Sequence, residues 1–297
     1  MSNDYIKNRK SNILQKRVDA LRVRYFLALP GKESLVKMIY EAELGESVYN
    51  SNAIENSTLT LEETEKILLQ IDLDRFISER EMFEAKNLAK VMEYIWANAK
   101  EKSVSLDMIL FLHKVLISNI RDEIAGRFRQ GSEFVRVGSH IAPDPRDVIS
   151  LLGAALYLYQ ARTGEDIIKR VARLHLDFEH VHPFVDGNGR IGRVLNNYFL
   201  IQEGFVPINV KFADRKKYYE AFAEFDKSKK TDIMENIVGL GMLQAYYKRL
   251  AYMESKQIML LSQYAKLIKT SNQNLINKAK RGTVEAFMEK NVWKIGV

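Results

Sequence analysis

The chain has 297 residues, no cysteine, a formal net charge of +7 and 46% apolar residues. The lack of cysteine excludes disulfides and thiolate metal sites, and the composition favours a globular protein of the cytoplasm with one large domain and smaller additions. No apolar run approaches the roughly 18 residues that a membrane-spanning helix requires, so no membrane partner is expected.

The positive charge lies at the two ends of the chain. Residues 1–28 carry seven basic side chains against two acidic ones, and residues 255–297 carry eight against two. The middle of the chain is therefore mildly acidic. A basic C-terminal segment suits nucleic acid, although a solvated basic surface is the simpler interpretation from charge alone.

Most of the chain is predicted to be helical, because apolar residues recur at spacings of three and four, as between 88 and 96. Near the N-terminus, residues 51–56 (Ser-Asn-Ala-Ile-Glu-Asn) precede Thr60-Leu-Glu-Glu63, a helix-start signature. On local grounds Glu55 is an ordinary exposed carboxylate. The clear exception to helix is 133–148, where Phe134–Val137 alternates and Gly138 closes the run, which predicts a short β-hairpin or flap.

The most informative segment is 182–193, His-Pro-Phe-Val-Asp-Gly-Asn-Gly-Arg-Ile-Gly-Arg. The preceding helix is expected to end near Val181, because the residue before a proline avoids the α region. Gly187 and Gly189 permit a tight turn into a new helix that ends near Gln202. The N-terminus of a helix beside glycines is a ready anion site.

The residue types in this run suit chemistry on a polyphosphate. His182 can accept a proton near neutral pH, and Asp186 can hold Mg²⁺ among waters and phosphate oxygens. Arg190 and Arg193 lie on one helix face, where they can clamp phosphate. His175 is assigned to packing.

A zinc site is the alternative for this part of the chain. Histidine ligands on one helix are expected four residues apart, which is not the spacing found here, and two arginines stand beside them. A zinc site is therefore disfavoured for the set His175, Glu179, His180, His182 and Asp186.

The run resembles the signature of the Fic (filamentation induced by cAMP) family: His, any residue, Phe, any residue, Asp or Glu, Gly-Asn-Gly-Arg, two residues, Arg. All specified positions match, and the similarity extends over roughly residues 40–235, including 126–138 and Arg215–Tyr219. Fic proteins are all-α, and most transfer AMP from ATP to a hydroxyl side chain of a target protein. The resemblance thus implies a mainly all-α Fic fold with a short β-hairpin flap.

The resemblance also implies site residues. His182 would deprotonate the target hydroxyl, and Asp186 would bind Mg²⁺ at the α- and β-phosphates. Asp226 departs from the pattern, because relatives often have asparagine there, near the nucleotide. Gly189, in place of the lysine of the Doc-like branch, favours AMP transfer over phosphoryl transfer. The implied nucleotide-binding residues are Gly187, Asn188, Gly189 and Arg190 in an anion hole, Arg193 at the γ-phosphate, Val135, Arg136, Val137 and Gly138 in the flap, and Tyr218 and Tyr219 near the adenine.

Residues 51–56 resemble the inhibitory motif of the same family: Ser or Thr, three residues, Glu, then Gly or Asn. In that family the glutamate pairs with the second arginine of the signature, which here would be Glu55 with Arg193. The pair would remove the γ-phosphate clamp and leave ATP in a non-productive pose. Some relatives that carry this glutamate also remove AMP.

Residues 257–297 resemble, more loosely, small winged helix-turn-helix modules of the excisionase type. Helices are expected at 260–268 and 273–280, followed by a two-stranded wing at 283–287 and 292–295. Similar modules bind DNA, dock proteins or dimerise, so a homo-oligomer also stays open. The basic residues suited to DNA phosphates are Lys278, Lys280, Arg281, Lys290 and Lys294.

The expected order is N-terminal helices with the inhibitory motif (1–100), a Fic core (101–235), a connecting helix (236–256) and the module 257–297. The favoured function is an autoinhibited protein adenylyltransferase that uses ATP and Mg²⁺. Its target is a Ser, Thr or Tyr hydroxyl of another protein or of the chain itself. The alternatives are a DNA-binding regulator whose Fic domain senses nucleotide, against which His182 argues, and an enzyme that both adds and removes AMP.

Overall fold

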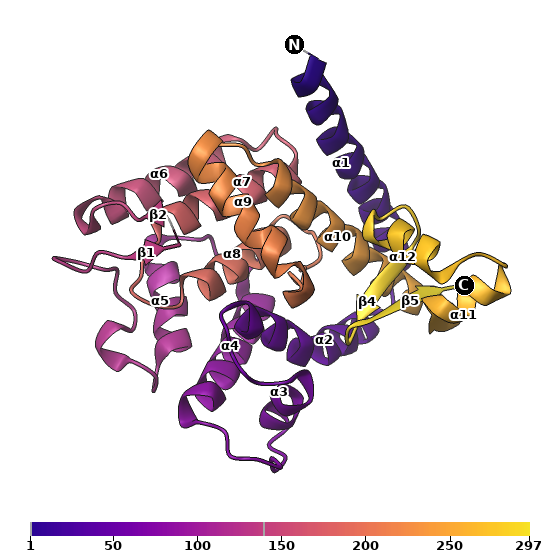
Figure 1. The fold of residues 1–297 in the computed structure, drawn as a ribbon, viewed down its shortest axis with the longest axis horizontal. Helices are drawn as coiled ribbons and strands as arrows, with labels where there is room; N and C mark the ends of the chain where they lie inside the picture. The colour runs from indigo at the N-terminus through magenta and orange to yellow at the C-terminus, as the bar shows by residue number, and fades with distance from the viewer. Residues whose placement is uncertain (1, 139) are drawn as a thin grey trace. The chain divides into compact units, whose positions relative to one another are not determined.

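The computed structural model describes residues 2–138 and 140–297, with side chains from residue 13 onward, and it divides into two compact units (Figure 1). One unit comprises residues 44–205 and 210–235 and contains the signature run. The other comprises the chain up to Glu43 together with 206–209 and 236–297. In the described part of the chain, no helix is both long enough and apolar enough to cross a membrane.

The signature-containing unit is a helical bundle, which confirms the predicted fold class. Helix α7 lies at its centre and packs against α6, α8 and α9, while α4 contacts α3, α5 and α8 (Figure 1). Its elements are the C-terminal half of α2 (Glu33–Ile54), α3 (Leu61–Leu68), α4 (Glu79–Asn98), α5 (Leu106–Ile117), α6 (Val148–Ala161), α7 (Ile167–Val181), α8 (Asn188–Gln202), α9 (Arg215–Ser228) and the 3₁₀ turns Asp122–Ile124, Pro145–Asp147 and Phe212–Asp214.

Short polar side chains fix where several of these helices begin. The hydroxyl of Thr60 accepts from the Glu63 backbone N–H, and the Glu63 carboxylate accepts from the Thr60 N–H, which confirms the expected helix start. Ser78 and Ser105 cap α4 and α5 in the simpler way, each accepting from an N–H three residues further on. These caps satisfy backbone donors that have no partner inside the helix.

The predicted hairpin is present and short. Strands β1 (Arg136–Val137) and β2 (His140–Ile141) are antiparallel, with Val137 opposite His140. The Ala142 N–H donates to the Val135 carbonyl at 3.0 Å and extends the pairing by one hydrogen bond. Gly138 has a φ of +60°, in the left-handed region that glycine tolerates and the turn needs.

The second unit combines long helices with a small sheet. The sheet has the order β3-β5-β4 and is antiparallel throughout, so the predicted two-stranded wing gains a third strand. The sequence did not reveal β3 because three residues joined directly to a helix leave no alternating pattern. The elements are α1 (Ser2–Ala28), the N-terminal half of α2, α10 (Asp232–Met253), β3 (Ile258–Leu260), α11 (Leu261–Leu267), α12 (Asn272–Lys280), β4 (Ala286–Glu289) and β5 (Val292–Gly296).

Buried ion pairs join α10 to its neighbours in this unit. The Lys248 ammonium lies 3.2 Å from a Glu43 carboxylate oxygen and 2.5 Å from one of Glu289, and Arg249 lies 2.7 Å from Glu43. The Arg249 side chain is only 1% exposed. A buried cation without a partner is very unfavourable. The carboxylate of Glu43 therefore stabilises the fold by neutralising Lys248 and Arg249.

We expect Glu43→Ala to lower the free energy of unfolding by about 3 kcal/mol, because it leaves the buried Arg249 without its anion. Denaturant unfolding measures the loss. The control is Glu41→Ala, which removes only an exposed pair with Lys37 and should cost less than about 1 kcal/mol. Equal losses in the two variants would contradict the role of the buried pair.

Candidate functional site

The signature run forms the connection between α7 and α8. His182 ends α7 in the left-handed conformation, with a φ of 49°, and Gly187 precedes α8 with a φ of 84°. Arg129, 2% exposed, clamps this loop: its Nε donates to the His182 carbonyl at 2.8 Å and its backbone N–H to the Pro183 carbonyl at 2.9 Å. The unusual backbone of a candidate catalytic residue is therefore fixed by a segment that precedes the flap.

Phe184 anchors the loop in the core. Its ring stacks on the His113 imidazole at 3.7 Å between centroids, and the Asn188 amide bonds both the N–H and the carbonyl of Phe184 at 2.8 Å. His113 Nε2 donates to the Asp186 carbonyl at 3.0 Å, and Nδ1 accepts from Gly126 at 3.1 Å. Burial lowers the pKa of His113 to about 4, which agrees with a neutral ring. Both polar atoms of the Asn188 side chain are thus used inside the loop. Any contact of Asn188 with a ligand would therefore involve its backbone.

The His182 imidazole is neutral at physiological pH. Burial lowers its pKa to about 4, although the Glu179 carbonyl, 3.3 Å from Nδ1, works in the opposite direction. With a proton on Nδ1 toward that carbonyl, Nε2 carries the free lone pair. A neutral imidazole with an oriented lone pair is the state that a general base requires.

Glu179 lies beneath His182, one turn earlier on α7. Burial, followed by the nearby Glu55, raises the pKa of its carboxyl to about 8. One carboxyl oxygen lies 3.7 Å from His182 Nδ1. The other contacts Gly192, where an added Cβ would lie 2.6 Å away, so that glycine in the signature leaves room for the acid. A protonated carboxyl therefore lies at the bottom of the site, beneath His182.

Asp186 and Arg190 form an ionic cluster at the start of α8. One Asp186 oxygen accepts from the Gly187 N–H at 2.6 Å and from Arg190 at 3.1 Å, and the other accepts from Arg80 at 3.2 Å. Arg80 and Arg190 also share Glu84, at 3.1 and 3.4 Å. The Arg80 side chain is 57% exposed, so it can move away from a carboxylate oxygen that Mg²⁺ would use. The Asp186 carboxylate offers only oxygen atoms and is partly exposed. Both properties fit a magnesium ion that keeps several waters.

Arg193 is buried, and all three of its nitrogens are bonded. Nε donates to the Ser51 hydroxyl at 3.0 Å, Nη2 to the Ser51 carbonyl at 2.8 Å and to Glu55 at 2.9 Å, and Nη1 to the Tyr218 hydroxyl at 3.2 Å. Tyr218 also bonds His175 Nε2 at 2.7 Å. The structure thus brings together Glu55 and the second arginine of the signature, which are 138 residues apart.

Glu55 reaches this position because Gly189 has no side chain. A Cβ on Gly189 would lie 2.1 Å from the Glu55 carboxylate, which sits over the first turn of α8. The partial positive charge of a helix N-terminus favours an anion there. The residue after Glu55, Asn56, has a φ of 70°, which explains why glycine or asparagine suits that position.

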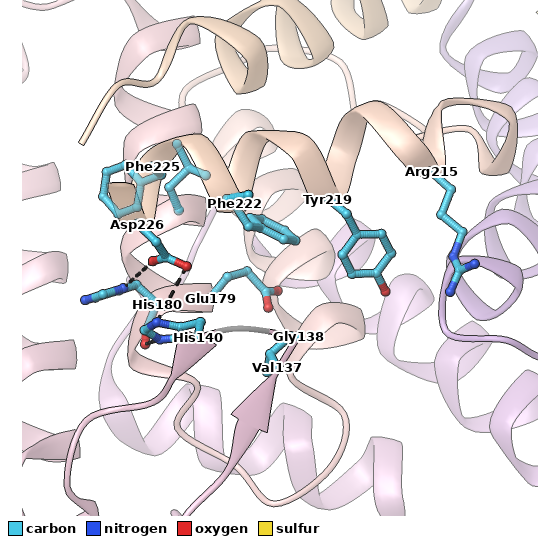
Figure 2. A pocket seen from close by; sticks show the side chains of 12 residues that line it. Val137, Gly138, His140, Glu179, His180, Arg215, Tyr219, Phe222, Phe225 and Asp226 are labelled. Carbon is cyan, nitrogen blue, oxygen red and sulfur yellow. Dashed lines mark hydrogen bonds and ion pairs between the residues drawn. The ribbon is translucent and has the colours of Figure 1, made fainter. Parts of the chain in front are cut away.

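A cavity of about 470 Å³ lies beside this cluster, between the flap and α9 (Figure 2). Tyr219, Val137 and Gly138, which are predicted nucleotide contacts, line it. Tyr218 lies in the core at 1% exposure, and Arg136 is exposed and bonds the Gly138 carbonyl. The full lining is Val137, Gly138, His140, Leu176, Glu179, His180, Arg215, Tyr219, Phe222, Ala223, Phe225 and Asp226.

Sequence reasoning missed several residues of this site. Arg80 lies far from the signature in the chain, and nothing in its surroundings marks it. Arg129 lies in the stretch 126–138 that resembles the family, but its contact with the signature loop was not predicted. Glu179 had a signal, since it stands three residues before His182 and therefore faces the same side of α7. His175 was assigned to packing and is buried, but its bond to Tyr218 makes it part of the Arg193 network.

Known proteins resemble this chain in sequence. The Fic/DOC family model matches residues 103–200, which include both the flap and the signature. The chain carries a Fic/DOC family domain. The chain is similar to proteins named protein adenylyltransferase Fic, with 31% identity over 219 residues in Nematostella vectensis and 30% over 218 in Drosophila virilis. These matches cover 72% and 68% of this chain, and 50% and 44% of the relatives, so the chain spans about half the length of the curated relatives it matches.

Solved structures share the fold of the Fic-domain chain. A Fic domain containing signaling protein from Bacteroides thetaiotaomicron has a TM-score of 0.72 at 20% identity, covering 81% of this chain and 97% of that one. Fic-1 from C. elegans has a TM-score of 0.70 at 24% identity, covering 85% and 74%. A Fic family protein from Desulfovibrio desulfuricans G20 has 0.66 at 20%, covering 96% of both.

The buried Glu179 predicts a pH dependence of stability. Folded protein keeps the proton up to about pH 8, whereas the unfolded chain loses it near pH 4.5. Between these values the folded state binds more protons, so its stability falls as pH rises, by at most about 1.4 kcal/mol per pH unit. The Glu179→Gln variant lacks this titration. Its melting temperature should therefore rise relative to wild type between pH 5 and pH 8, and no further above that.

The matched control is Glu220→Gln, at an exposed position on α9, whose melting temperature should follow wild type across the range. Buried neutral histidines destabilise the fold at low pH in every variant alike, so they cancel in the comparison. A constant difference between Glu179→Gln and wild type from pH 5 to pH 8 would rule out a proton on Glu179.

Proposed function

We propose that this Fic-domain chain is a protein adenylyltransferase that transfers AMP from ATP to a Ser, Thr or Tyr hydroxyl of a target protein or of itself, and that Glu55 inhibits it. The observation that carries the proposal is the Arg193 guanidinium, which binds Ser51 and Glu55 in the unit that also contains His182. The names of the curated relatives agree with the reaction. Their greater length makes activity, target and partners of this chain a matter for experiment.

Two parts of the site would bind ATP: the cavity would hold the nucleobase, and the start of α8 would hold the phosphates. The aromatic rings of Tyr219 and Phe222 and the backbone at Gly138 suit a nucleobase. The phosphates would lie at the N-terminus of α8, near Arg190 and Arg193, where helix amides and guanidinium groups favour anions. Mg²⁺ held by Asp186 would neutralise phosphate charge.

His182 supplies the base for the transfer. Its neutral Nε2 takes the proton of the target hydroxyl as that oxygen attacks the α-phosphorus of ATP. A phosphorus–oxygen bond forms to the target, the bond to the β-phosphate bridge breaks, and pyrophosphate leaves with its electron pair. The flap strand β1 would align an extended target segment by main-chain pairing and so present the hydroxyl to His182.

Glu55 inhibits by occupying the guanidinium that the γ-phosphate needs. Arg193 has bonds on all three nitrogens in the present arrangement. A phosphate group can approach Nη2 only if the Glu55 carboxylate leaves. Since Glu55 is 33% exposed and stands just after the end of α2, a small movement of that end would release it.

We expect Glu55→Gly to raise AMP transfer roughly 10- to 100-fold, the value of one charge-assisted hydrogen bond to the γ-phosphate of ATP. Incubation of the protein with labelled ATP and Mg²⁺ measures transfer to itself, and mass spectrometry of lysate proteins identifies other targets. Glu55→Gln should act in the same direction, because it keeps the size and removes the charge. His182→Ala in the Glu55→Gly background should abolish labelling.

Two results separate the parts of this proposal. Equal labelling by wild type and both Glu55 variants would overturn inhibition by Glu55 while leaving the transferase in place. Full labelling in the His182→Ala variant would overturn the assignment of the base.

We further propose that α12 binds DNA phosphates. Three basic side chains, Lys278, Lys280 and Arg281, are exposed at the C-terminal end of this helix, which follows α11 after a short turn. Lys294, by contrast, is 2.5 Å from Glu289 and already paired. The buried face of α12, with Leu275 and Ala279, packs into the core of the small sheet domain and leaves the basic face outward.

We expect the affinity for a duplex to fall with salt, with a slope of log affinity against log salt near −0.9 per phosphate contact. Replacing Lys278 and Lys280 together by alanine should reduce the size of that slope by roughly 2. Fluorescence anisotropy with a labelled duplex measures both. Lys266→Ala, at an exposed position of α11, is the control, and the same slope in all proteins would contradict the assignment to α12.

A further inference from the structure

We propose that His140, His180 and Asp226 bind a divalent transition-metal ion of the zinc class, at a site separate from Asp186. Each of the three offers one ligand atom, and those atoms all lie within 4.8 Å of one another. This proposal does not depend on the transferase activity. It rests on how the three side chains are oriented and on the chemistry of their donor atoms.

Three elements of one unit bring the ligands together. His140 lies in the flap strand β2, His180 in the last turn of α7, and Asp226 near the end of α9. Figure 2 shows the Asp226 carboxylate beside the two imidazoles, with an interaction drawn to each. His180 Nδ1 lies 2.7 Å from one carboxylate oxygen, and His140 Nδ1 lies 3.5 Å from the other.

The orientation of His140 favours a cation between it and Asp226. His140 Nε2 lies 2.9 Å from the His180 carbonyl, which can only accept, so Nε2 carries the proton. The Nδ1 of a neutral ring then presents a lone pair to a carboxylate oxygen that also only accepts. Metal-binding histidines are commonly held this way, with the other ring nitrogen donating to a carbonyl.

His180 must change its tautomer to become a ligand through Nδ1. The Lys229 ammonium, which can only donate, lies 3.4 Å from His180 Nε2, so without metal Nδ1 carries the hydrogen and donates to Asp226. Metal would replace that hydrogen and move it to Nε2. Lys229 is exposed and can turn away. The site is therefore expected to be weakened by Lys229, which favours the tautomer that cannot bind metal through Nδ1.

The donor set selects the metal. Two imidazoles and one carboxylate suit zinc, cobalt and nickel, whereas Mg²⁺ prefers oxygen ligands alone. The side chains are 15%, 31% and 27% exposed and line the 470 Å³ cavity, which leaves room for water at the remaining coordination positions. A bound ion would join the flap to α7 and α9.

The test uses the full, untagged chain freed of metal. Co²⁺ titration followed by visible absorption, and Zn²⁺ titration by calorimetry, should each show one site. Asp226→Asn and His140→Ala should each weaken Zn²⁺ binding at least roughly 10-fold. Loss of a residue that only hydrogen-bonds a metal ligand already lowers metal affinity by about that factor. Lys229→Met should strengthen it a few-fold, roughly, by removing a nearby positive charge.

The controls are His182→Ala and Asp186→Asn, which should leave Co²⁺ spectra and Zn²⁺ affinity unchanged. Absence of saturable binding would overturn the proposal. So would unchanged affinity in Asp226→Asn and His140→Ala, or loss of binding in His182→Ala, which would place the ion at the signature. Lys229→Met alters only an exposed side chain, so a gain in its affinity would support the site even if a ligand variant failed to fold.

Discussion

The buried guanidinium of Arg193 is the constraint on which the rest of the site depends. A cation at 5% exposure must be paired, and its partners come from the end of α2 and from α9. Those contacts fix where Ser51, Glu55 and Tyr218 lie relative to α8. Glu55 is thus positioned by the requirement to neutralise an arginine that the proposed reaction also uses. In the proposed mechanism, inhibition and catalysis therefore compete for one charge.

In the proposed mechanism, an anion faces Arg193 in both the inhibited and the active state. When a γ-phosphate replaces Glu55 at Arg193, one anion takes the place of another. Glu179, whose pKa is raised first by burial and then by Glu55, therefore keeps a negative neighbour in either state. A protonated Glu179 beneath His182 does not stabilise an imidazolium as a carboxylate would. In the proposed mechanism, the His182 base therefore stays neutral whichever anion occupies Arg193.

Features that depend on one continuous stretch of chain could be predicted from the sequence. Helical periodicity, the Thr60 cap, the Gly138 hairpin and the twelve-residue signature each lie within one stretch of chain, and the structure has all of them. What could not be predicted involves distant segments. Arg129 clamps the His182 loop across 53 residues, and Arg80 reaches Asp186 across 106. No pattern in one sequence records such pairs, because each arginine alone resembles a solvated surface residue.

The same limit explains why the sequence did not reveal the proposed site at His140, His180 and Asp226. Along α7, the spacing of His175, His180 and His182 argued against zinc, and that argument applies to ligands from one helix only. His180 finds its partners in a hairpin and in α9, at positions where His140 and Asp226 carry no local sign of a site. Asp186, surrounded by Arg80 and Arg190, offers a hard oxygen alone. The two proposed sites therefore differ in donor chemistry, with oxygen alone suited to Mg²⁺ at one and two imidazoles suited to a zinc-class ion at the other.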